Sequence, residues 1–260
     1  MDYVSRIVCD DVANITLNRP ELHNAFNEVV MAELTEAFTT VGAEDNVRAI
    51  ILRSEGKSFC AGADVNWMKR MVGYSIEENV EDANLLARML RTIRECPKPV
   101  IARIHGAAIG GGVGLAAACD IAVAVESGVF CLSEVKLGII PAVISPFVLE
   151  KIGMGNMRRY ALTAERFSAA EAKRIGLIHE VLASVEEMDA WIEAQLKLIL
   201  SNGPEAMSMC KRVLDEVSAI DWDRIQSLTT RRIAERRVSS EGQEGLKSFL
   251  EKKPPNWAGS

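Results

Sequence analysis

The sequence lacks the features typical of metal-binding, disulfide-rich and membrane proteins. Its six cysteines are scattered with no C-x-x-C pair, and its three histidines stand far apart. Zinc sites and disulfide frameworks need closely spaced ligands or paired cysteines, so neither is predicted. The longest stretch without ionised side chains near the middle, residues 104–119, is mostly Gly and Ala. It is too short and too weakly apolar to cross a bilayer.

The sequence also has no excess of positive charge. Thirty Lys+Arg against 36 Asp+Glu give a net charge of −6, so the chain as a whole is not attracted to nucleic acid or to an anionic membrane. Aromatic residues make up only 5%, but hydrophobic residues reach 48% of the 260 positions, which is enough for a substantial core. The N-terminal residues carry no basic segment followed by an apolar one, so we expect a cytoplasmic protein.

Short Val- and Ile-rich runs alternate with helical patterns in the first half of the chain. The predicted strands are Arg6–Cys9, Val12–Leu17, Ala49–Arg53, Val100–Ile104, Ile121–Val125 and Val129–Leu132. The predicted helices are Asn27–Val41, Ile76–Glu95, Ala169–Ile175, Val185–Leu200, Glu205–Val217 and Trp222–Val238. Strands and helices that alternate in this way predict an α/β core.

The last third of the chain is helical almost throughout. No strand is predicted from about Ser184 onward. We therefore divide the chain into a core at 1–183 and a helical region at 184–260, and we interpret the second part as an appendage of the first.

Three common nucleotide-binding and hydrolase motifs are incomplete or absent in this sequence. Gly56-Lys57-Ser58 lacks the glycine that a P-loop requires five residues earlier, where Ile51 stands. The glycines at 110–114 do not fit the G-x-G-x-x-G spacing of a dinucleotide site, and no G-x-S-x-G elbow of a serine hydrolase occurs.

Two segments of small residues remain, each at a turn from a strand into a helix. Phe59–Asp64 precedes the amphipathic stretch Val65–Met71, and His105–Gly112 precedes the small-residue helix Val113–Cys119. Such turns expose backbone N–H groups, and two of them converging on one oxygen would stabilise an oxyanion. The structural alternatives are a tight loop in the first segment and close helix packing in the second.

Glu134 is an isolated acid in an apolar run that follows a predicted strand. Burial there would raise the pKa of its carboxyl group and suit it to proton transfer. The alternatives are an ion pair with Lys136 or a solvent-exposed charge.

Six blocks in the same order resemble the crotonase, or enoyl-CoA hydratase/isomerase, superfamily. They are Leu17–Pro20 with His23–Ala25, Phe59–Asp64, Gly106–Asp120, Glu134–Pro141, Leu162–Ser168 with Gly176–Leu177, and Phe249–Trp257. The resemblance implies an α/β fold, the ClpP/crotonase-like spiral of ββα units, followed by a C-terminal helical trimerisation region. It also implies a homotrimer or a hexamer built as a dimer of trimers.

The resemblance further assigns roles to individual positions. Ala63 and Gly111 would supply the two oxyanion-hole N–H groups, and Glu134 matches the glutamate that exchanges a proton at the α-carbon. The substrate that the resemblance implies is a coenzyme A thioester, with no permanently bound cofactor. Its binding positions match His23, Ala25, Ala61, Asp64, Val65, Asn66, Gly110, Pro141, Phe249, Lys252 and Lys253.

One departure from the family pattern concerns the first catalytic glutamate. In ordinary hydratases this residue positions water, and here Gly114 takes its place. A single carboxylate is the pattern of Δ3,Δ2-enoyl-CoA isomerases, so isomerisation by Glu134 as the sole base is the alternative to hydration.

Finer similarities favour hydration. Residues 64–71, 130–135 and 140–146 resemble the bacterial methylglutaconyl-CoA hydratases of leucine and isovalerate breakdown, a group that also has glycine at the first position. The distal carboxylate of that substrate needs a cation, for which Lys69, Arg70 and His105 are candidates. Trp67, Met68 and Met71 are candidates for the acyl pocket, with a core role as the alternative.

A different class of function would be a non-catalytic or RNA-binding relative. Its only support is the basic cluster of Arg231, Arg232, Arg236 and Arg237, and a solvated or intersubunit face explains that cluster better. Thioester hydrolysis is disfavoured because nothing in the resemblance directs water to the carbonyl carbon. We therefore expect no nucleic-acid partner and no membrane partner.

Overall fold

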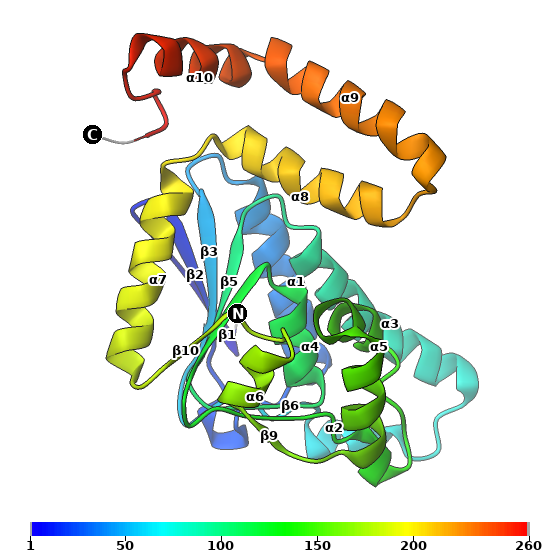
Figure 1. Ribbon diagram of the computed structural model, residues 1–260. Helices are drawn as coiled ribbons and strands as arrows, with labels where there is room; N and C mark the ends of the chain where they lie inside the picture. Colours follow the sequence, from blue (N-terminus) through cyan, green and yellow to red (C-terminus); the bar gives the residue numbers. More distant parts are fainter. Residues whose placement is uncertain (1, 259–260) are drawn as a thin grey trace.

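The architecture is that of a computed structural model, which describes residues 2–258 (Figure 1). A six-stranded sheet has the order β1-β2-β3-β5-β7-β10, and all its neighbouring strands are parallel except β1 and β2. Its strands are β1 (Val4–Cys9), β2 (Val12–Leu17), β3 (Ala49–Ser54), β5 (Val100–Ile104), β7 (Ile121–Val125) and β10 (Glu180–Leu182).

A second, smaller sheet has the order β4-β6-β8-β9. Its strands are β4 (Ser58–Cys60), β6 (Ala107–Ile109), β8 (Val129–Cys131) and β9 (Phe167–Ser168). Along the chain, each of β3, β5 and β7 is followed by a strand of the small sheet and then by helical structure. This repeated order is the spiral of ββα units that the crotonase resemblance implies.

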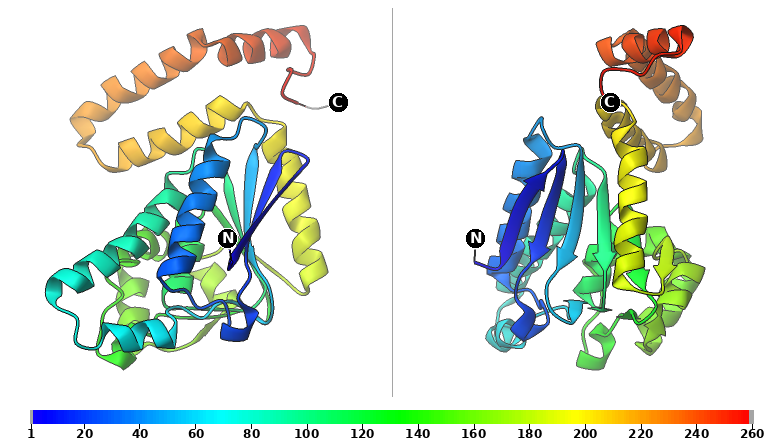
Figure 2. Two further views of the ribbon diagram at one scale, coloured as in Figure 1. Left: turned by 180° about the vertical axis from the view of Figure 1, so that it is seen from behind. Right: turned by 90° about the vertical axis from the view of Figure 1, so that its left-hand side faces the viewer.

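Helices cover both faces of the large sheet. Alternate residues of a strand point to opposite faces, so Ile50 and Leu52 of β3 join the core that contains α1, whereas Ala49 and Ile51 pack with α7. Figure 2 shows α7 standing against one side of the sheet. Burial on both faces explains why these strands are apolar without alternation.

The helices that shape the site follow the strands of the small sheet. The helices up to α7 are α1 (Glu28–Ala43), α2 (Val65–Met71), α3 (Ile76–Arg94), α4 (Gly111–Ala118), α5 (Ser145–Thr163), α6 (Ala169–Arg174) and α7 (Val185–Leu200). Two short 3-10 helices, η1 (Pro20–Leu22) and η2 (Glu134–Leu137), lie in the connections.

The last three helices stand apart from the sheet, at the top of Figure 1. They are α8 (Pro204–Ser218), α9 (Trp222–Val238) and α10 (Ser240–Glu251). None of them has a buried side chain in the single chain, and Trp222 and Phe249 are each 82% exposed. The helical region predicted from 184 onward therefore has two parts, because α7 packs on the sheet whereas α8–α10 leave it.

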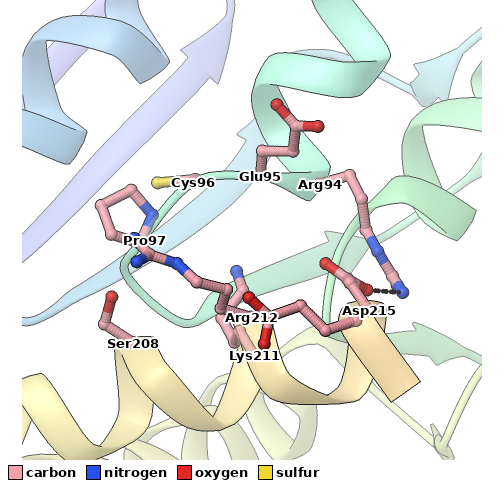
Figure 3. Close-up of a pocket in the computed structure, with 9 residues that line it drawn as sticks. Arg94, Glu95, Cys96, Pro97, Ser208, Lys211, Arg212 and Asp215 are labelled. Carbon is pink, nitrogen blue, oxygen red and sulfur yellow. Dashed lines mark hydrogen bonds and ion pairs between the residues drawn. The ribbon is translucent and has the colours of Figure 1, made fainter. Parts of the chain in front are cut away.

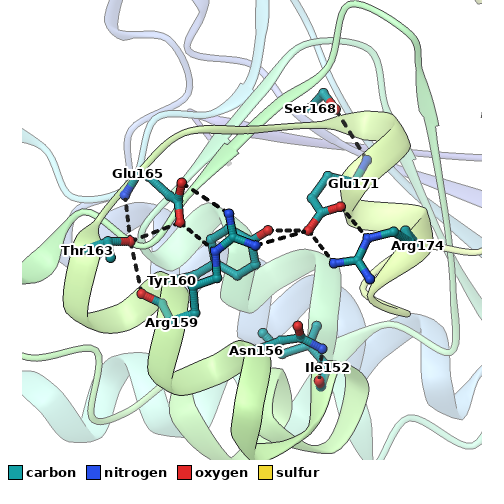
Figure 4. Close-up of polar contacts among 9 residues, drawn as sticks. All are labelled: Ile152, Asn156, Arg159, Tyr160, Thr163, Glu165, Ser168, Glu171 and Arg174. Carbon is teal, nitrogen blue, oxygen red and sulfur yellow. Dashed lines mark hydrogen bonds and ion pairs between the residues drawn. The ribbon is translucent and has the colours of Figure 1, made fainter.

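A polar cluster joins the end of α5 to α6 (Figure 4). Arg159 Nε donates to Glu165 Oε1 at 2.8 Å, and Arg174 Nη2 donates to Glu171 Oε1 at 2.7 Å. The Arg174 guanidinium, together with the Tyr160 hydroxyl, lowers the pKa of Glu171 to about 2. Glu171 is therefore ionised at neutral pH, and the cluster has a structural explanation in the junction of the two helices.

All six predicted strands and all six predicted helices are present, within a few residues at each end. Ser168 caps α6 as a serine at a helix start often does, with its Oγ accepting from Glu171 N at 3.2 Å. The periodicity missed β4, β6, β9, β10, α5 and α10. Gly153, at φ 71°, interrupts α5 and breaks its helical pattern, and glycines within α10 lower its helix propensity.

Every helix among residues 2–258 is too short or too polar to span a membrane. Over the same residues, no three His, Cys, Asp or Glu side chains gather in a way that could hold a metal ion.

Candidate active site

The loop before α2 leaves one backbone N–H without an acceptor. Phe26 N donates to Gly62 O at 2.8 Å, and Asp64 N donates to Phe26 O at 3.0 Å. These two bonds fix the loop on both sides of Ala63. The N–H of Ala63 itself makes no hydrogen bond to any described residue.

The start of α4 presents a second N–H of the same kind. Gly110 N donates to Cys131 O at 2.8 Å, which ties the turn to β8. Gly111 is the first residue of α4, so its N–H has no partner within the helix, and none occurs elsewhere among the described residues. A Cβ on Gly62 would lie 3.8 Å from Gly111 N, so the two loops are in contact.

Glycine is required at 111 because Phe26 fills the adjacent space. A Cβ added there would lie 2.2 Å from Phe26 Cζ, far inside normal contact. At Gly110 the backbone has φ 53°, a conformation that favours glycine. The glycine run therefore brings backbone N–H groups close to a cavity, in addition to allowing close packing.

Ala63 and Gly111 lie in the wall of one cavity of about 620 Å³. Most of the other lining is apolar. It comprises Phe26, Ala61, Gly62, Trp67, Met68, Met71, Asn79, Ala83, Leu86, Gly110, Ser133, Glu134, Leu137, Gly138, Ile139, Ile140, Pro141, Ala142, Val143 and Ile144. Glu134 is the one ionisable side chain in this described lining.

Glu134 is the first residue of η2, directly after β8. Its Oε2 is buried and has no hydrogen-bond partner among the described residues. Burial raises the pKa of its carboxyl group above the usual value. The structure shows no ion pair between Glu134 and Lys136 within the described chain, so the structural alternative from the sequence is not supported. The raised pKa makes the Glu134 carboxylate a stronger base than an exposed one, and it lines the cavity.

Gly114 has no room for the side chain that the family carries there. A Cβ at this position would lie 2.5 Å from Ile144 Cγ2 and 2.9 Å from Ile144 Cβ. Ile144 is 2% exposed and also lines the cavity. Ile144 thus occupies the volume beside Gly114, and the site has a single carboxylate.

Asp64 holds the first loop in place rather than lining the cavity. Its Oδ2 lies 2.6 Å from Arg19 Nη1, and its Oδ1 accepts from Asn66 N at 2.6 Å at the start of α2. Burial alone would raise the pKa of Asp64, but the Asn66 N–H and the Arg19 guanidinium outweigh it and lower the pKa. Arg19 also donates to Ala25 O at 3.1 Å, so it joins both segments.

The predicted binding positions divide into two groups. Those that line the cavity, beside the catalytic ones, are Ala61, Gly110 and Pro141, together with the acyl-pocket candidates Trp67, Met68 and Met71. Those outside the lining are His23, Ala25, Asp64, Val65 and Asn66. His23 Nδ1 lies 3.1 Å from Ser58 Oγ, at the base of the same loop, and its binding role stays a prediction.

α10, which carries Phe249 and is followed by Lys252 and Lys253, lies at the far end of the molecule from the cavity. Figures 1 and 2 show α10 above the sheet, whereas α2, which lines the cavity, lies at the lower end. These residues do not approach the site of their own chain, so any contact with a substrate would be in a second subunit.

The cationic candidates for a distal carboxylate also lie outside the lining. Arg70 Nη2 binds Glu28 at 2.5 and 2.7 Å, and His105 Nε2 lies 2.9 Å from Gly56 O. Lys69 follows Met68 on α2 but does not line the cavity.

The basic cluster of α9 is largely neutralised. Arg231 pairs with Glu235 at 2.7 Å, Arg232 with Glu216 at 2.6 Å, and Arg236 with Glu241 at 2.8 Å. These pairs favour the structural explanation of the cluster over nucleic-acid binding.

A second cavity, of about 340 Å³, lies where α8 meets the end of α3 (Figure 3). Two of its charged groups form ion pairs, with Arg94 Nη2 at 2.6 Å from Asp215 Oδ1 and Lys211 Nζ at 2.6 Å from Asp120 Oδ2. These ion pairs attach α8 to the core, and they account for the polar character of this cavity.

For two features of the site the family resemblance marked the residues but not their contacts. The wall formed by residues 137–144 is a loop without periodicity, and its contact with Gly114 joins positions 30 residues apart. Arg19 stands in one of the family blocks, but only its contact with Asp64 shows what it does.

Comparison with known proteins places the chain in one family. The enoyl-CoA hydratase/isomerase family matches residues 9–260. A crotonyl-CoA hydratase from Syntrophomonas wolfei is 33% identical over 250 residues, which cover 95% of both chains. An enoyl-CoA hydratase structure from Shewanella pealeana shares 41% identity at a TM-score of 0.94 and covers 98% of this chain and 96% of its own.

Pseudomonas aeruginosa AtuE superposes with a TM-score of 0.95 at 33% identity, over 99% of this chain and all of its own (100%). Sequence, fold and the arrangement of the two loops around one cavity agree with each other. The chain therefore belongs to the enoyl-CoA hydratase/isomerase family, within the crotonase superfamily.

Proposed function

We propose that this protein is an enoyl-CoA hydratase-type lyase, which adds water across the 2,3-double bond of an acyl-CoA thioester. One observation supports this proposal above the others. The carboxylate of Glu134, whose Oε2 is buried without a hydrogen-bond partner among the described residues, lines the same cavity as two backbone N–H groups, those of Ala63 and Gly111, that have no acceptor among those residues.

The chemistry follows from these three groups. The two N–H groups would donate to the thioester oxygen and stabilise the enolate more than the ketone, which lowers the barrier for reaction at the α- and β-carbons. Glu134 in its carboxylate form takes a proton from water while the oxygen bonds to the β-carbon. The same carboxyl group then returns the proton to the α-carbon. Coenzyme A enters as part of the substrate, and no resident cofactor has a role.

For the acyl group we propose 3-methylglutaconyl-CoA, a substrate of leucine and isovalerate breakdown. The support is the likeness of residues 64–71, 130–135 and 140–146 to hydratases of that substrate. The described lining of one chain holds no cation for the distal carboxylate. This proposal therefore requires a cation from outside that lining, for which Lys252 and Lys253 of a second subunit are candidates.

A homotrimer or hexamer would meet that requirement. Its support is α8–α10, whose side chains are all at least partly exposed in the single chain. Apolar residues on these helices, including Phe249 and Leu250, would be buried by a second copy.

Δ3,Δ2-Enoyl-CoA isomerisation is a second candidate, favoured by one observation. Ile144 fills the space beside Gly114, so the cavity offers one base and no second carboxylate for water. Moving a proton along an acyl chain needs only one base.

A panel of three thioesters separates these functions. The purified protein is given 3-methylglutaconyl-CoA, crotonyl-CoA and a 3-enoyl-CoA, and the products are followed by chromatography. Hydration of the first with the highest kcat/KM supports the substrate proposal. Hydration of crotonyl-CoA alone supports a hydratase but removes that substrate. Exclusive turnover of the 3-enoyl-CoA establishes the isomerase.

A further inference from the structure

Ser133 is a polar residue in the cavity that the proposed mechanism has not yet used. It directly precedes Glu134, is partly buried, and lines the cavity. It stands at the N-cap of η2, where a serine hydroxyl commonly accepts a backbone N–H. Here the side chain makes no cap hydrogen bond, so it has no such structural role.

The hydroxyl of Ser133 and the carboxylate of Glu134 lie against the same side of Gly110. A Cβ added to Gly110 would lie 3.1 Å from Glu134 Oε1 and 3.6 Å from Ser133 Oγ. Because Gly110 has no side chain, the space next to both oxygens is open. Gly110 also directly precedes Gly111, whose N–H faces the thioester oxygen in the proposed function.

No other polar side chain of the lining is as well placed. Asn79 donates its Nδ2 to Ser75 O at 2.9 Å and to Tyr74 O at 3.3 Å, so its amide hydrogens are used within its own helix turn. Gly114 and Ile144 contribute no polar side chain. Within the described lining, Ser133 is the one hydroxyl.

We propose that Ser133 is a catalytic residue that holds the attacking water for Glu134. This inference rests on the proposed hydratase function. The water donates one hydrogen to Glu134 and is held at its oxygen by the Ser133 O–H. On attack, the water oxygen bonds to the β-carbon, its proton moves to Glu134, and the π electron pair moves to the thioester oxygen as an enolate. The enolate then takes that proton at the α-carbon, so the sum is one water added.

Ser133 thus replaces the positioning role of the glutamate that is missing at Gly114. It acts on the β-carbon side only, because exchange of the α-proton needs Glu134, the two N–H groups and replacement of the carboxyl proton by solvent, but no water positioned to attack the β-carbon. Hydration and α-proton exchange should therefore respond differently to the loss of this hydroxyl.

The test compares Ser133→Ala with Ser133→Thr, which retains the hydroxyl, and with Ser168→Ala as a matched control. Ser168 caps α6 and lies outside the cavity. Hydration is measured with whichever thioester the wild type hydrates. Exchange is measured as deuterium uptake from D2O into a saturated acyl-CoA, which has α-protons but no double bond for water.

For Ser133→Ala we expect kcat for hydration to fall about 10- to 100-fold, as for the loss of one hydrogen bond to a charged or reacting group, with deuterium exchange within about twofold of wild type. Ser133→Thr recovers most of the hydration. Ser168→Ala lowers the melting temperature but leaves both rates unchanged, because it loses only a helix cap.

Two results would overturn the inference. Unchanged hydration in Ser133→Ala would show that the hydroxyl does not hold the water. Equal losses of hydration and exchange would show that Ser133 acts only by placing Glu134. A wild-type protein that exchanges α-protons but hydrates no thioester would instead refute the proposed function, so the two failures are distinguishable.

Discussion

Gly111→Ala tests whether the backbone of the α4 turn takes part in the reaction. The new Cβ would lie 2.2 Å from Phe26 Cζ and 2.9 Å from Cε1. Carbon atoms in contact are about 3.5–4.0 Å apart, so the ring or the turn must move by more than about 1 Å. Phe26 is 1% exposed and its ring centroid lies 6.3 Å from that of Trp67, so the ring has little room to move. The turn at Gly111 should therefore take up at least part of the displacement.

Such overpacking lowers the free energy of unfolding by about 1–3 kcal/mol. Because that free energy is about 5–15 kcal/mol for a typical protein, the variant should still fold. The displaced N–H of Gly111 would no longer face the thioester oxygen, and loss of one oxyanion-hole donor lowers kcat about 10²- to 10³-fold. Urea unfolding measures the first effect, and steady-state hydration of the best thioester substrate measures the second.

Gly106→Ala is the matched control. Its Cβ would lie 2.2 Å from the backbone oxygen of Lys57, an equally short contact, but Gly106 does not line the cavity. Backbone atoms move less easily than a side chain, so Gly106→Ala should lower the free energy of unfolding at least as much as Gly111→Ala. The folded Gly106→Ala protein should nevertheless keep most of its kcat. Equal losses of kcat in the two variants would refute the assignment of Gly111 to the oxyanion hole.

Three further predictions follow from other contacts. Glu134→Gln should lower kcat about 10²- to 10⁴-fold by removing the base. Because burial raises the pKa of Glu134 above its usual 4.5, the wild-type free energy of unfolding should fall as pH rises through that window. Glu134→Gln should then melt higher at pH 7 but not below pH 4.5, and equal melting curves at pH 7 would contradict this. Arg19→Ala leaves Asp64 buried without its partner and should cost about 3–5 kcal/mol in urea unfolding, whereas breaking the exposed Arg91–Glu95 pair should cost less than about 1 kcal/mol. Phe249→Ser should shift the mass measured by light scattering toward smaller species, and an unchanged mass would exclude this face from the subunit interface.

The sequence was most informative where one residue type carries a physical requirement. Val- and Ile-rich runs predicted β2, β3, β5 and β7 of the large sheet, because burial on both faces favours apolar residues along most of each strand. An acid in an apolar run predicted a carboxyl group withdrawn from solvent, and Glu134 is partly buried with its Oε2 fully buried. Small residues at two turns predicted exposed N–H groups, which Ala63 and Gly111 present to one cavity.

Features that depend on contacts distant in sequence were not predictable. Of the small sheet only β8 was predicted; β4, β6 and β9 have two or three residues each, too few for any periodicity. The absence of a glutamate at Gly114 was visible, but its replacement by Ile144 appears only when α4 meets the loop before α5. Likewise, α7 was expected in an appendage, and only the cluster of Met188, Ile192 and Ile199 shows that it covers the sheet.

The lack of buried side chains in the C-terminal helices α8–α10 affects how stability should be measured. In one chain α8–α10 bury no side chain, so these helices depend mainly on hydrogen bonds and ion pairs, among them those that attach α8 to the core. If subunits supply the missing contacts, folding of this region and association become one equilibrium. The melting temperature should then rise with protein concentration, and dilution alone should loosen the C-terminal third before the sheet is affected. Stabilities of variants in this region are comparable only at a fixed protein concentration.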